Sequence, residues 1–147
     1  MSSILPTIVA DNFFSNPEDV VKLSKKYKYH KPTKINNWPG KRSECLHLKN
    51  YDFFKQIILK VLSYYYPNVE LTFRNSAVYF HKIKPNDIGK NHFHFDINYD
   101  IAAIVYLSEG DINTGTTIFN KDNKKQIIVS NDFNTMVCYD TKKYHGP

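Results

Sequence analysis

The sequence predicts an α+β fold in which two helices precede a series of short strands that form a jelly roll or barrel. Three observations support this prediction. A helix start occupies residues 15–19, apolar residues recur at three- and four-residue spacing over residues 51–66, and β-rich segments alternate with turns from residue 71 onward. No helical pattern separates the strands, so a doubly wound sheet is excluded.

The amino-terminal half contains both predicted helices. Residues 4–14 suggest a short strand, and Ser15-Asn16-Pro17-Glu18-Asp19 then combines a polar cap, an early proline and acids near the positive end of the helix dipole. Residues 30–50 are expected to be irregular. The second helix covers residues 51–66 and ends at Pro67, which has no amide hydrogen to donate.

The carboxy-terminal half reads as strands separated by turns. The turns are marked by runs of Pro, Gly, Asn, Asp and Ser, which favour tight turns. The strand candidates are residues 71–84, 92–98, 101–108, 116–120, 126–129 and 135–139. Several short strands of this kind are typical of an all-β core supported by the two helices.

Composition limits the class of protein. A chain of 147 residues with 41% hydrophobic residues suits one domain, 1–147, in which residues 1–70 support a core formed by residues 71–147. No segment approaches the ~20 apolar residues of a membrane span, and no signal peptide is evident. The two cysteines indicate a reducing, cytoplasmic setting. The net charge of +6 comes from scattered lysines, so we rank nucleic acid last among the partners.

Residues 91–100, NHFHFDINYD, place possible metal ligands at alternate positions. On a strand such positions share a face, so His94 and Asp96 project together. With His145 downstream they would form the two-histidine, one-carboxylate triad that holds non-heme Fe(II). His92 is an alternative: it could replace His94, form a cupin-type pair with it, or line the cavity. The alternative without a metal is a hydrogen-bonded His–Asp pair on a surface strand.

These residues resemble a known family. His94-Phe95-Asp96, the apolar segment 102–107, the segment 115–119 (GTTIF) and His145 are similar to 2-oxoglutarate- and Fe(II)-dependent dioxygenases, nearest the prolyl-4-hydroxylase-like branch with its phage and bacterial members. The opening IVADNFFSNPEDVV is similar as well. The resemblance implies a double-stranded β-helix with His94, Asp96 and His145 as iron ligands.

The resemblance also implies a reaction. Fe(II), 2-oxoglutarate and O₂, with ascorbate as an accessory reductant, would hydroxylate a prolyl or other amino-acid side chain or a small molecule. Tyr79 and Thr117 are the candidates for contact with 2-oxoglutarate, although packing explains Tyr79 equally well and strand propensity is the default explanation for Thr117. Trp38 and Arg42, in a loop, are candidates for contact with a peptide, protein or small-molecule substrate, as is His92.

The sequence departs from the family in one respect. The family places an Arg or Lys that grips 2-oxoglutarate on a strand after the distal histidine, and this sequence ends two residues after His145. We therefore expect the final barrel strands to be missing, which leaves an unpaired edge suited to homo-oligomer formation. A fragment of a longer protein, a barrel completed by another chain and an inactive relative all explain this. The alternative function is a catalytically silent jelly-roll or cupin-like binding module.

Overall fold

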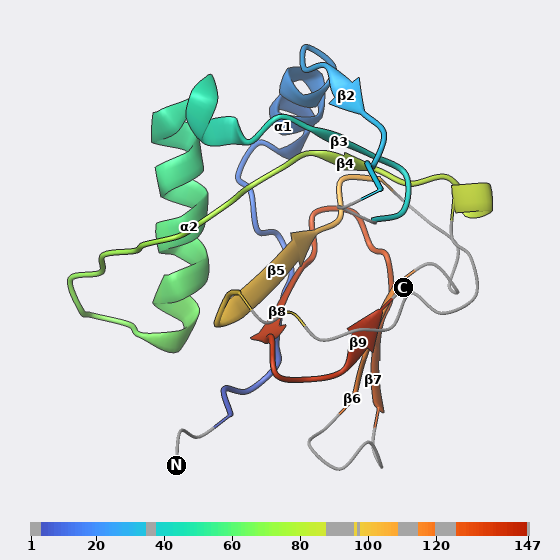
Figure 1. Ribbon diagram of the computed structural model, residues 1–147. Coiled ribbons are helices and arrows are strands. Elements are labelled where there is room, and N and C mark those ends of the chain that lie inside the picture. The colour runs from blue at the N-terminus through green and yellow to red at the C-terminus, as the bar shows by residue number, and fades with distance from the viewer. Residues whose placement is uncertain are drawn as a thin grey trace. The chain divides into compact units, whose positions relative to one another are not determined.

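The computed structural model describes residues 4–34, 38–87, 96, 98–108, 115–119 and 126–146 (Figure 1). The chain divides into two compact units. Unit 1 joins Met1–Glu18 to His92–Pro147, and unit 2 is Asp19–Asn91. The described residues contain two α-helices and three small antiparallel sheets, which confirms the α+β class, and none of these sheets closes into a barrel.

Unit 1 contains two of the three-stranded sheets. In the first, the central strand β8 (Met136–Asp140) pairs on one side with β1 (Ile8–Ala10), from the first segment of unit 1, and on the other with β5 (Ile101–Val105), from the second. In the second, the order is β7 (Gln126–Val129), β6 (Thr116–Phe119), β9 (His145–Gly146). A strand therefore lies in each of the predicted ranges 101–108, 116–120, 126–129 and 135–139, whereas β9 was not expected. Most of the predicted strand 92–98 lies outside the described residues.

The two sheets of unit 1 share one apolar core. Alternate residues along each strand point inward, as the two-residue period of a strand requires. The core comprises Ile118, Val129, Val137 and Tyr139, with Ala102, Ile104 and Tyr106 packed against it. Each fully buried large apolar side chain contributes about 1.5–3 kcal/mol to folding. Strand β8 is buried along its whole length because it is the central strand of its sheet.

Asn134 joins the amino-terminal segment of unit 1 to the end of β8 through hydrogen bonds. Its side-chain oxygen accepts the Phe14 amide hydrogen at 2.8 Å, and its side-chain nitrogen donates to the Phe14 carbonyl at 2.8 Å. Its backbone carbonyl accepts the Phe13 amide hydrogen at 3.0 Å. Asn134 has a φ of 62°, a left-handed conformation that asparagine tolerates better than most residues. The Asn134 amide thus continues the β1–β8 pairing past the end of the strands.

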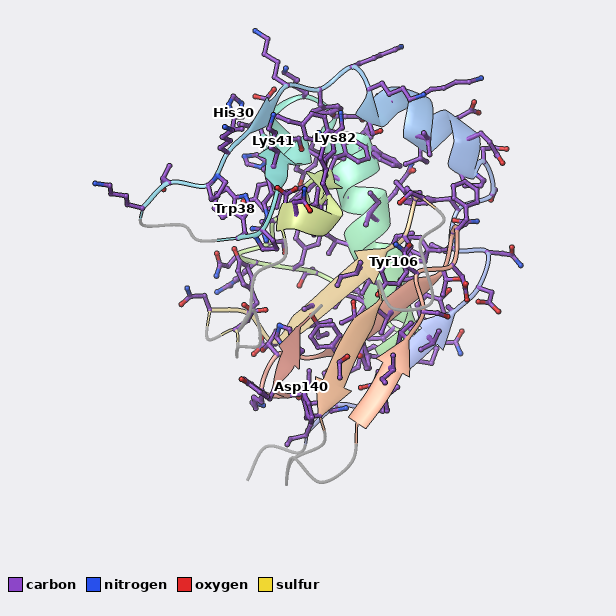
Figure 2. All side chains as sticks on the ribbon, turned by 90° about the vertical axis from the view of Figure 1, so that its right-hand side faces the viewer. His30, Trp38, Lys41, Lys82, Tyr106 and Asp140 are labelled. Carbon is purple, nitrogen blue, oxygen red and sulfur yellow. The ribbon has the colours of Figure 1, made fainter. Side chains whose placement is uncertain are left out.

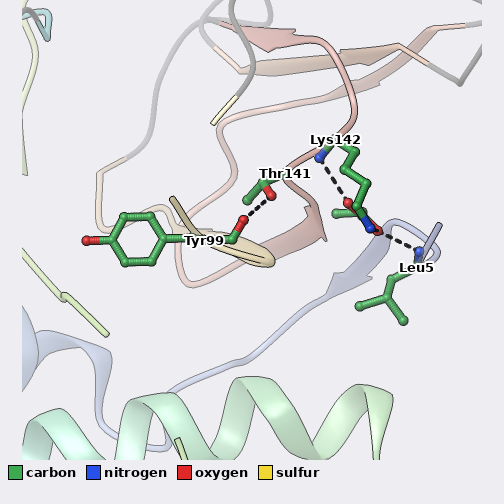
Figure 3. Close-up of polar contacts among 5 residues, drawn as sticks. Leu5, Tyr99, Thr141 and Lys142 are labelled. Carbon is green, nitrogen blue, oxygen red and sulfur yellow. Dashed lines mark hydrogen bonds and ion pairs between the residues drawn. The ribbon is translucent and has the colours of Figure 1, made fainter. Parts of the chain in front are cut away.

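Asp140 provides a second attachment at the other end of β8 (Figure 3). Its carboxylate is 1% exposed and accepts the amide hydrogens of Leu5 and Lys142, both at 2.9 Å. The hydroxyl of the next residue, Thr141, donates to the Tyr99 carbonyl. Buried carboxylates persist where charged hydrogen bonds replace water, and these contacts fix the turn that leads to β9.

Unit 2 contains helix α2, most of helix α1 and the third sheet. Helix α1 is Pro17–Ser24, and helix α2 is Tyr51–Tyr65, where the Asn50 side chain caps the helix by accepting the Phe53 amide hydrogen at 3.2 Å. Both helices confirm the sequence prediction. Two single 3₁₀ turns, η1 (Leu46–Leu48) and η2 (Pro85–Asp87), lie beside the sheet strands. The sheet has the order β2 (Tyr29–His30), β3 (Lys41–Ser43), β4 (His81–Lys82).

The sheet of unit 2 differs from the sequence prediction. Strands β2 and β3 lie in a segment that we expected to be irregular, and residues 71–84 contribute only β4 among the described strands. Before β4, backbone and side chains share the pairing with β3 and η1. The Ser43 and Leu46 amides donate to the Phe80 and Val78 carbonyls, both at 2.9 Å, while the Phe80 amide donates to Ser43 Oγ at 3.0 Å and the Val78 amide to Cys45 Sγ at 3.4 Å. No helix in the described ranges is both long and apolar enough to cross a membrane.

Candidate metal centre

His145 reaches the interior of unit 1 because β9 pairs with β6. In the antiparallel register, His145 lies directly opposite Ile118, which is 1% exposed. Directly opposite residues project from the same face of a sheet, so the His145 side chain shares the inward face with Ile118 and is 3% exposed itself. The turn after β8, in which the Lys143 amide donates to the Asp140 carbonyl at 3.0 Å, returns the chain to this position.

The structure brings together two of the three predicted iron ligands. His145 Nε2 lies 3.2 Å from Oδ2 of Asp96, whose side chain is half-buried. The remaining predicted ligand, His94, and the alternative, His92, lie outside the described residues. Within the described ranges no group of three or more His, Cys, Asp and Glu side chains gathers as a metal site.

A backbone hydrogen bond orients the His145 ring. Its Nδ1 lies 2.8 Å from the carbonyl oxygen of Lys143. A carbonyl accepts only, so Nδ1 carries the hydrogen, and in the neutral ring Nε2 then holds a lone pair directed at the Asp96 carboxylate. A lone pair and a carboxylate repel each other unless a proton or a cation lies between them. Metal-ligating histidines are commonly fixed by this kind of second hydrogen bond.

The spacing of the two donor atoms fits one metal ion. Nitrogen and oxygen ligands lie about 2.0–2.2 Å from a first-row divalent metal such as zinc. Two neighbouring ligands at such distances are then roughly 3.0 Å apart in octahedral geometry and about 3.4 Å apart in tetrahedral geometry. The observed separation of 3.2 Å lies between these values. The same separation also suits an ion pair between a protonated His145 and Asp96.

Two tyrosines line the core beside this pair. The Tyr139 ring centroid lies 4.7 Å from that of His145. Burial, followed by the nearby charge of Asp96 and by Tyr106, raises the pKa of Tyr139 far above its usual value, so its hydroxyl stays protonated. The Tyr106 hydroxyl lies 2.5 Å from Thr116 Oγ1, and burial raises the pKa of Tyr106 as well. The neutral Tyr139 hydroxyl, next to the His–Asp pair, can donate a hydrogen bond to a bound anion.

Thr117, a predicted contact of 2-oxoglutarate, lies on the other face of β6. Thr116 and Ile118 point into the core, and Thr117 lies opposite Ile128, which is 62% exposed. A shift of one residue along a strand moves a side chain to the opposite face. Thr116 is therefore the threonine of this strand that faces the core. Sequence reasoning missed it together with Tyr106, although their alternation with Ile118 and Ile104 was visible.

The other predicted contact residues lie together in unit 2. The guanidinium carbon of Arg42 is 4.7 Å from the Trp38 ring centroid and 5.5 Å from that of Tyr79. Arg42 thus contacts both rings, as a cation does in a cation–π interaction. The predicted substrate residues Trp38 and Arg42 and the predicted cosubstrate residue Tyr79 form one cluster in unit 2, whereas His145 and Asp96 belong to unit 1.

Comparison with known proteins does not identify the family. No family model, curated protein or solved structure matches this chain. The similarity to 2-oxoglutarate-dependent dioxygenases therefore depends on the quoted sequence motifs, and the geometry of His145 and Asp96 is an independent observation.

Proposed function

We propose that this protein is a non-heme Fe(II)- and 2-oxoglutarate-dependent oxygenase that hydroxylates an amino-acid side chain, such as a prolyl residue, or a small molecule. The observation that carries the proposal is the 3.2 Å approach of His145 Nε2 to Asp96 Oδ2, with Nδ1 held by the Lys143 carbonyl. Two residues that the sequence motif selects, far apart in the chain, meet with the spacing of two ligands of one metal.

The fold proposed for this function is a double-stranded β-helix. Two three-stranded antiparallel sheets that share one core support it, because a jelly roll packs two such sheets face to face. His145 on β9 and Asp96, shortly before β5, then supply ligands from separate segments of unit 1. His94 completes the triad in this proposal.

The residues of unit 1 have distinct roles in the proposed centre. His94, Asp96 and His145 hold the iron, which with 2-oxoglutarate supplies the oxidising chemistry. The Lys143 carbonyl fixes the His145 ring so that Nε2 is the ligating nitrogen. Tyr106 and Thr116 present hydroxyl groups suited to a carboxylate of the cosubstrate. Tyr139, a member of the apolar core, packs beside the His145 ring, whereas the Asp96 side chain stays partly exposed to solvent.

Anaerobic Fe(II) titration tests this proposal. The parent protein should bind one Fe(II), and Asp96→Ala and His145→Ala should each abolish stoichiometric binding. His30→Ala, which replaces an exposed histidine of unit 2, is the matched control and should bind as the parent does. Equal binding by parent, Asp96→Ala and His145→Ala would refute the metal assignment. Release of CO₂ from labelled 2-oxoglutarate by the iron-loaded parent tests the oxygenase assignment separately.

A catalytically silent binding module is the second candidate. It is favoured by the fact that His145 and Asp96 can satisfy each other as a direct ion pair once His145 is protonated, with no metal. In this case the parent would bind no Fe(II), and Asp96→Ala would lower the free energy of unfolding without any metal-dependent change. A parent protein that gains thermal stability with stoichiometric Fe(II) would exclude this candidate.

A further inference from the structure

The charge of the chain is divided unequally between its two units. Unit 2 contains fifteen Lys and Arg residues and five Asp and Glu residues, a formal net charge of +10. Unit 1 contains five basic and nine acidic residues, a formal net charge of −4. The overall value of +6 conceals this difference. A charge of +10 on 73 residues creates a positive potential that attracts polyanions.

Basic residues form two pairings across the sheet of unit 2. Arg42 on β3 lies opposite His30 on β2 and opposite His81 on β4, so these three residues share one face. Lys41 lies opposite Lys82 on the other face, and both are exposed. Figure 2 shows His30, Lys41 and Lys82 around this sheet, with Trp38 beside it. We call β2, β3 and β4 together with Trp38 and Tyr79 the basic sheet.

Aromatic rings contact cationic side chains on both faces of the basic sheet. Arg42 contacts the rings of Trp38 and Tyr79, and Tyr79 is 43% exposed. On the other face the Lys82 ammonium lies 3.9 Å from the Tyr29 ring centroid. Arginine planes and aromatic rings stack on nucleobases, while lysine and arginine contact phosphates. Trp38 and Arg42 are neighbours in the sequence, whereas Tyr79 and the Lys82–Tyr29 pair come from other segments, so the sequence shows only part of this arrangement.

The turn that carries Trp38 is fixed against β4. Gly40 has a φ of +73°, and a Cβ there would lie 2.1 Å from the Lys82 carbonyl oxygen, so the turn packs directly on the β4 backbone. His81 Nε2 lies 2.5 Å from the Pro39 carbonyl oxygen, and burial is the main reason that the pKa of His81 is lowered. Trp38 is therefore held in place before any ligand binds, which reduces the entropy lost on binding.

We propose that the basic sheet binds single-stranded nucleic acid, with bases stacked on Trp38 and Tyr79 and phosphates contacting Arg42 beside these rings and Lys41 and Lys82 on the other face. Charge alone would suit any polyanion, but the fixed aromatic rings among the cations favour one that carries planar bases. Acidic peptides, sulfated polysaccharides and anionic membranes offer charge without bases. This function is independent of the iron centre, because the residues that carry it belong to unit 2 and the ligands to unit 1.

The single tryptophan of the chain reports directly on this surface. Trp38 is the only tryptophan, so titration of the full chain with a 15-residue oligothymidylate in EDTA should quench its fluorescence as a base stacks on it. Anisotropy of the labelled oligonucleotide should give an affinity that falls with salt, with a log–log slope of about −0.7 for each phosphate contact. Heparin should compete for the charge but leave the fluorescence unquenched.

Paired variants locate the binding surface. Lys41→Gln with Lys82→Gln should weaken binding and reduce the salt slope, whereas Lys55→Gln with Lys60→Gln on α2, which removes the same charge, should have a smaller effect. Tyr79→Ala should weaken binding at least about fivefold, the loss expected for one stacked base, and Tyr66→Ala, at the end of α2, should not. Circular dichroism establishes that each variant is folded.

Three results would overturn the proposal: oligothymidylate binding without quenching of Trp38, equal losses from the two lysine pairs, or tighter binding of heparin or phosphatidylserine vesicles than of the oligonucleotide. Asp96→Ala separates this proposal from the iron centre. It should lose Fe(II) and retain the oligonucleotide, so failure of one assignment leaves the other testable.

Discussion

His145 Nε2 lies 3.2 Å from Asp96 Oδ2, and the two residues reach this distance from separate parts of unit 1, His145 from β9 and Asp96 from the segment before β5. The pairing of β9 with β6 turns the histidine into the core, and the Lys143 carbonyl fixes the ring. A neutral histidine in this orientation directs a lone pair at a carboxylate, which is favourable when a cation lies between them.

Asp96→Asn should remove most of the affinity for Fe(II) while keeping the shape of the side chain. The amide offers a neutral oxygen in place of the anionic ligand, so the loss should exceed the roughly 10–100-fold typical of a residue that only supports a ligand. Isothermal titration under nitrogen measures it. Asp132→Asn, at an exposed carboxylate that accepts the Ser130 hydroxyl, is the control. An unchanged affinity in Asp96→Asn would contradict the assignment.

Asn134→Ala should destabilise unit 1. The change removes two side-chain hydrogen bonds to Phe14 and places alanine at a φ of 62°, so we expect a loss of about 2–4 kcal/mol in the free energy of unfolding. Urea titration measures this loss. Asn68→Ala is a matched control, because Asn68 is exposed with a φ of 61° and so isolates the backbone term. Equal losses in the two variants would show that the Phe14 contacts contribute nothing.

Gly115→Ala should disrupt the start of β6. A Cβ at this position would lie 1.7 Å from the Val129 carbonyl oxygen, so β6 and β7 must separate to admit it. We expect a loss of more than about 2 kcal/mol, in the range of strongly overpacked substitutions. Thr117→Ala, on the outer face of the same strand, should cost less. Thermal unfolding compares them, and an equal Tm for Gly115→Ala and the parent would contradict the close packing.

Stability should decline at alkaline pH. Burial raises the pKa of Tyr139, Tyr106 and Tyr29, so each stays protonated in the folded chain at a pH where it ionises in the unfolded chain. Their contribution is intact below the unfolded value, near 10, and is lost as pH rises through the higher folded values. Tyr139 and Tyr106 should each subtract up to about 1.4 kcal/mol per pH unit, whereas solvent around the more exposed Tyr29 makes its contribution small.

Urea unfolding from pH 8 to 12 follows this decline. Tyr139→Phe should lessen the slope above pH 10 because it removes the most strongly shifted of these groups. Tyr66→Phe, at an exposed tyrosine, should leave the slope unchanged. If Tyr139→Phe has the same slope as the parent, the Tyr139 hydroxyl is not held protonated by the fold.

Both helices and most of the strands could be predicted from the sequence because the patterns that specify them extend over only a few neighbouring residues. The proline and acids of residues 15–19 and the apolar repeat of residues 51–66 predicted both helices. Alternating apolar residues predicted β5 to β8, and the motif around Asp96 with the distant His145 selected two residues that do meet. Helix caps and strand periodicity act over a few residues, so the sequence displays them directly.

The strand register, the presence of β9 and the composition of the basic sheet depend on which distant segments of the chain pair. Which threonine of residues 116 and 117 faces the core depends on the register of β6, and β9 exists because β6 offers it an edge. The basic sheet gathers Trp38, Arg42 and Tyr79 from two separate segments, and so the linear order of charges and rings concealed it. Sequence alone specified the local conformations and the chemistry of individual side chains. Bringing residues from distant segments together required long-range hydrogen bonds and burial. The free energy of these contacts depends on which distant segments pair.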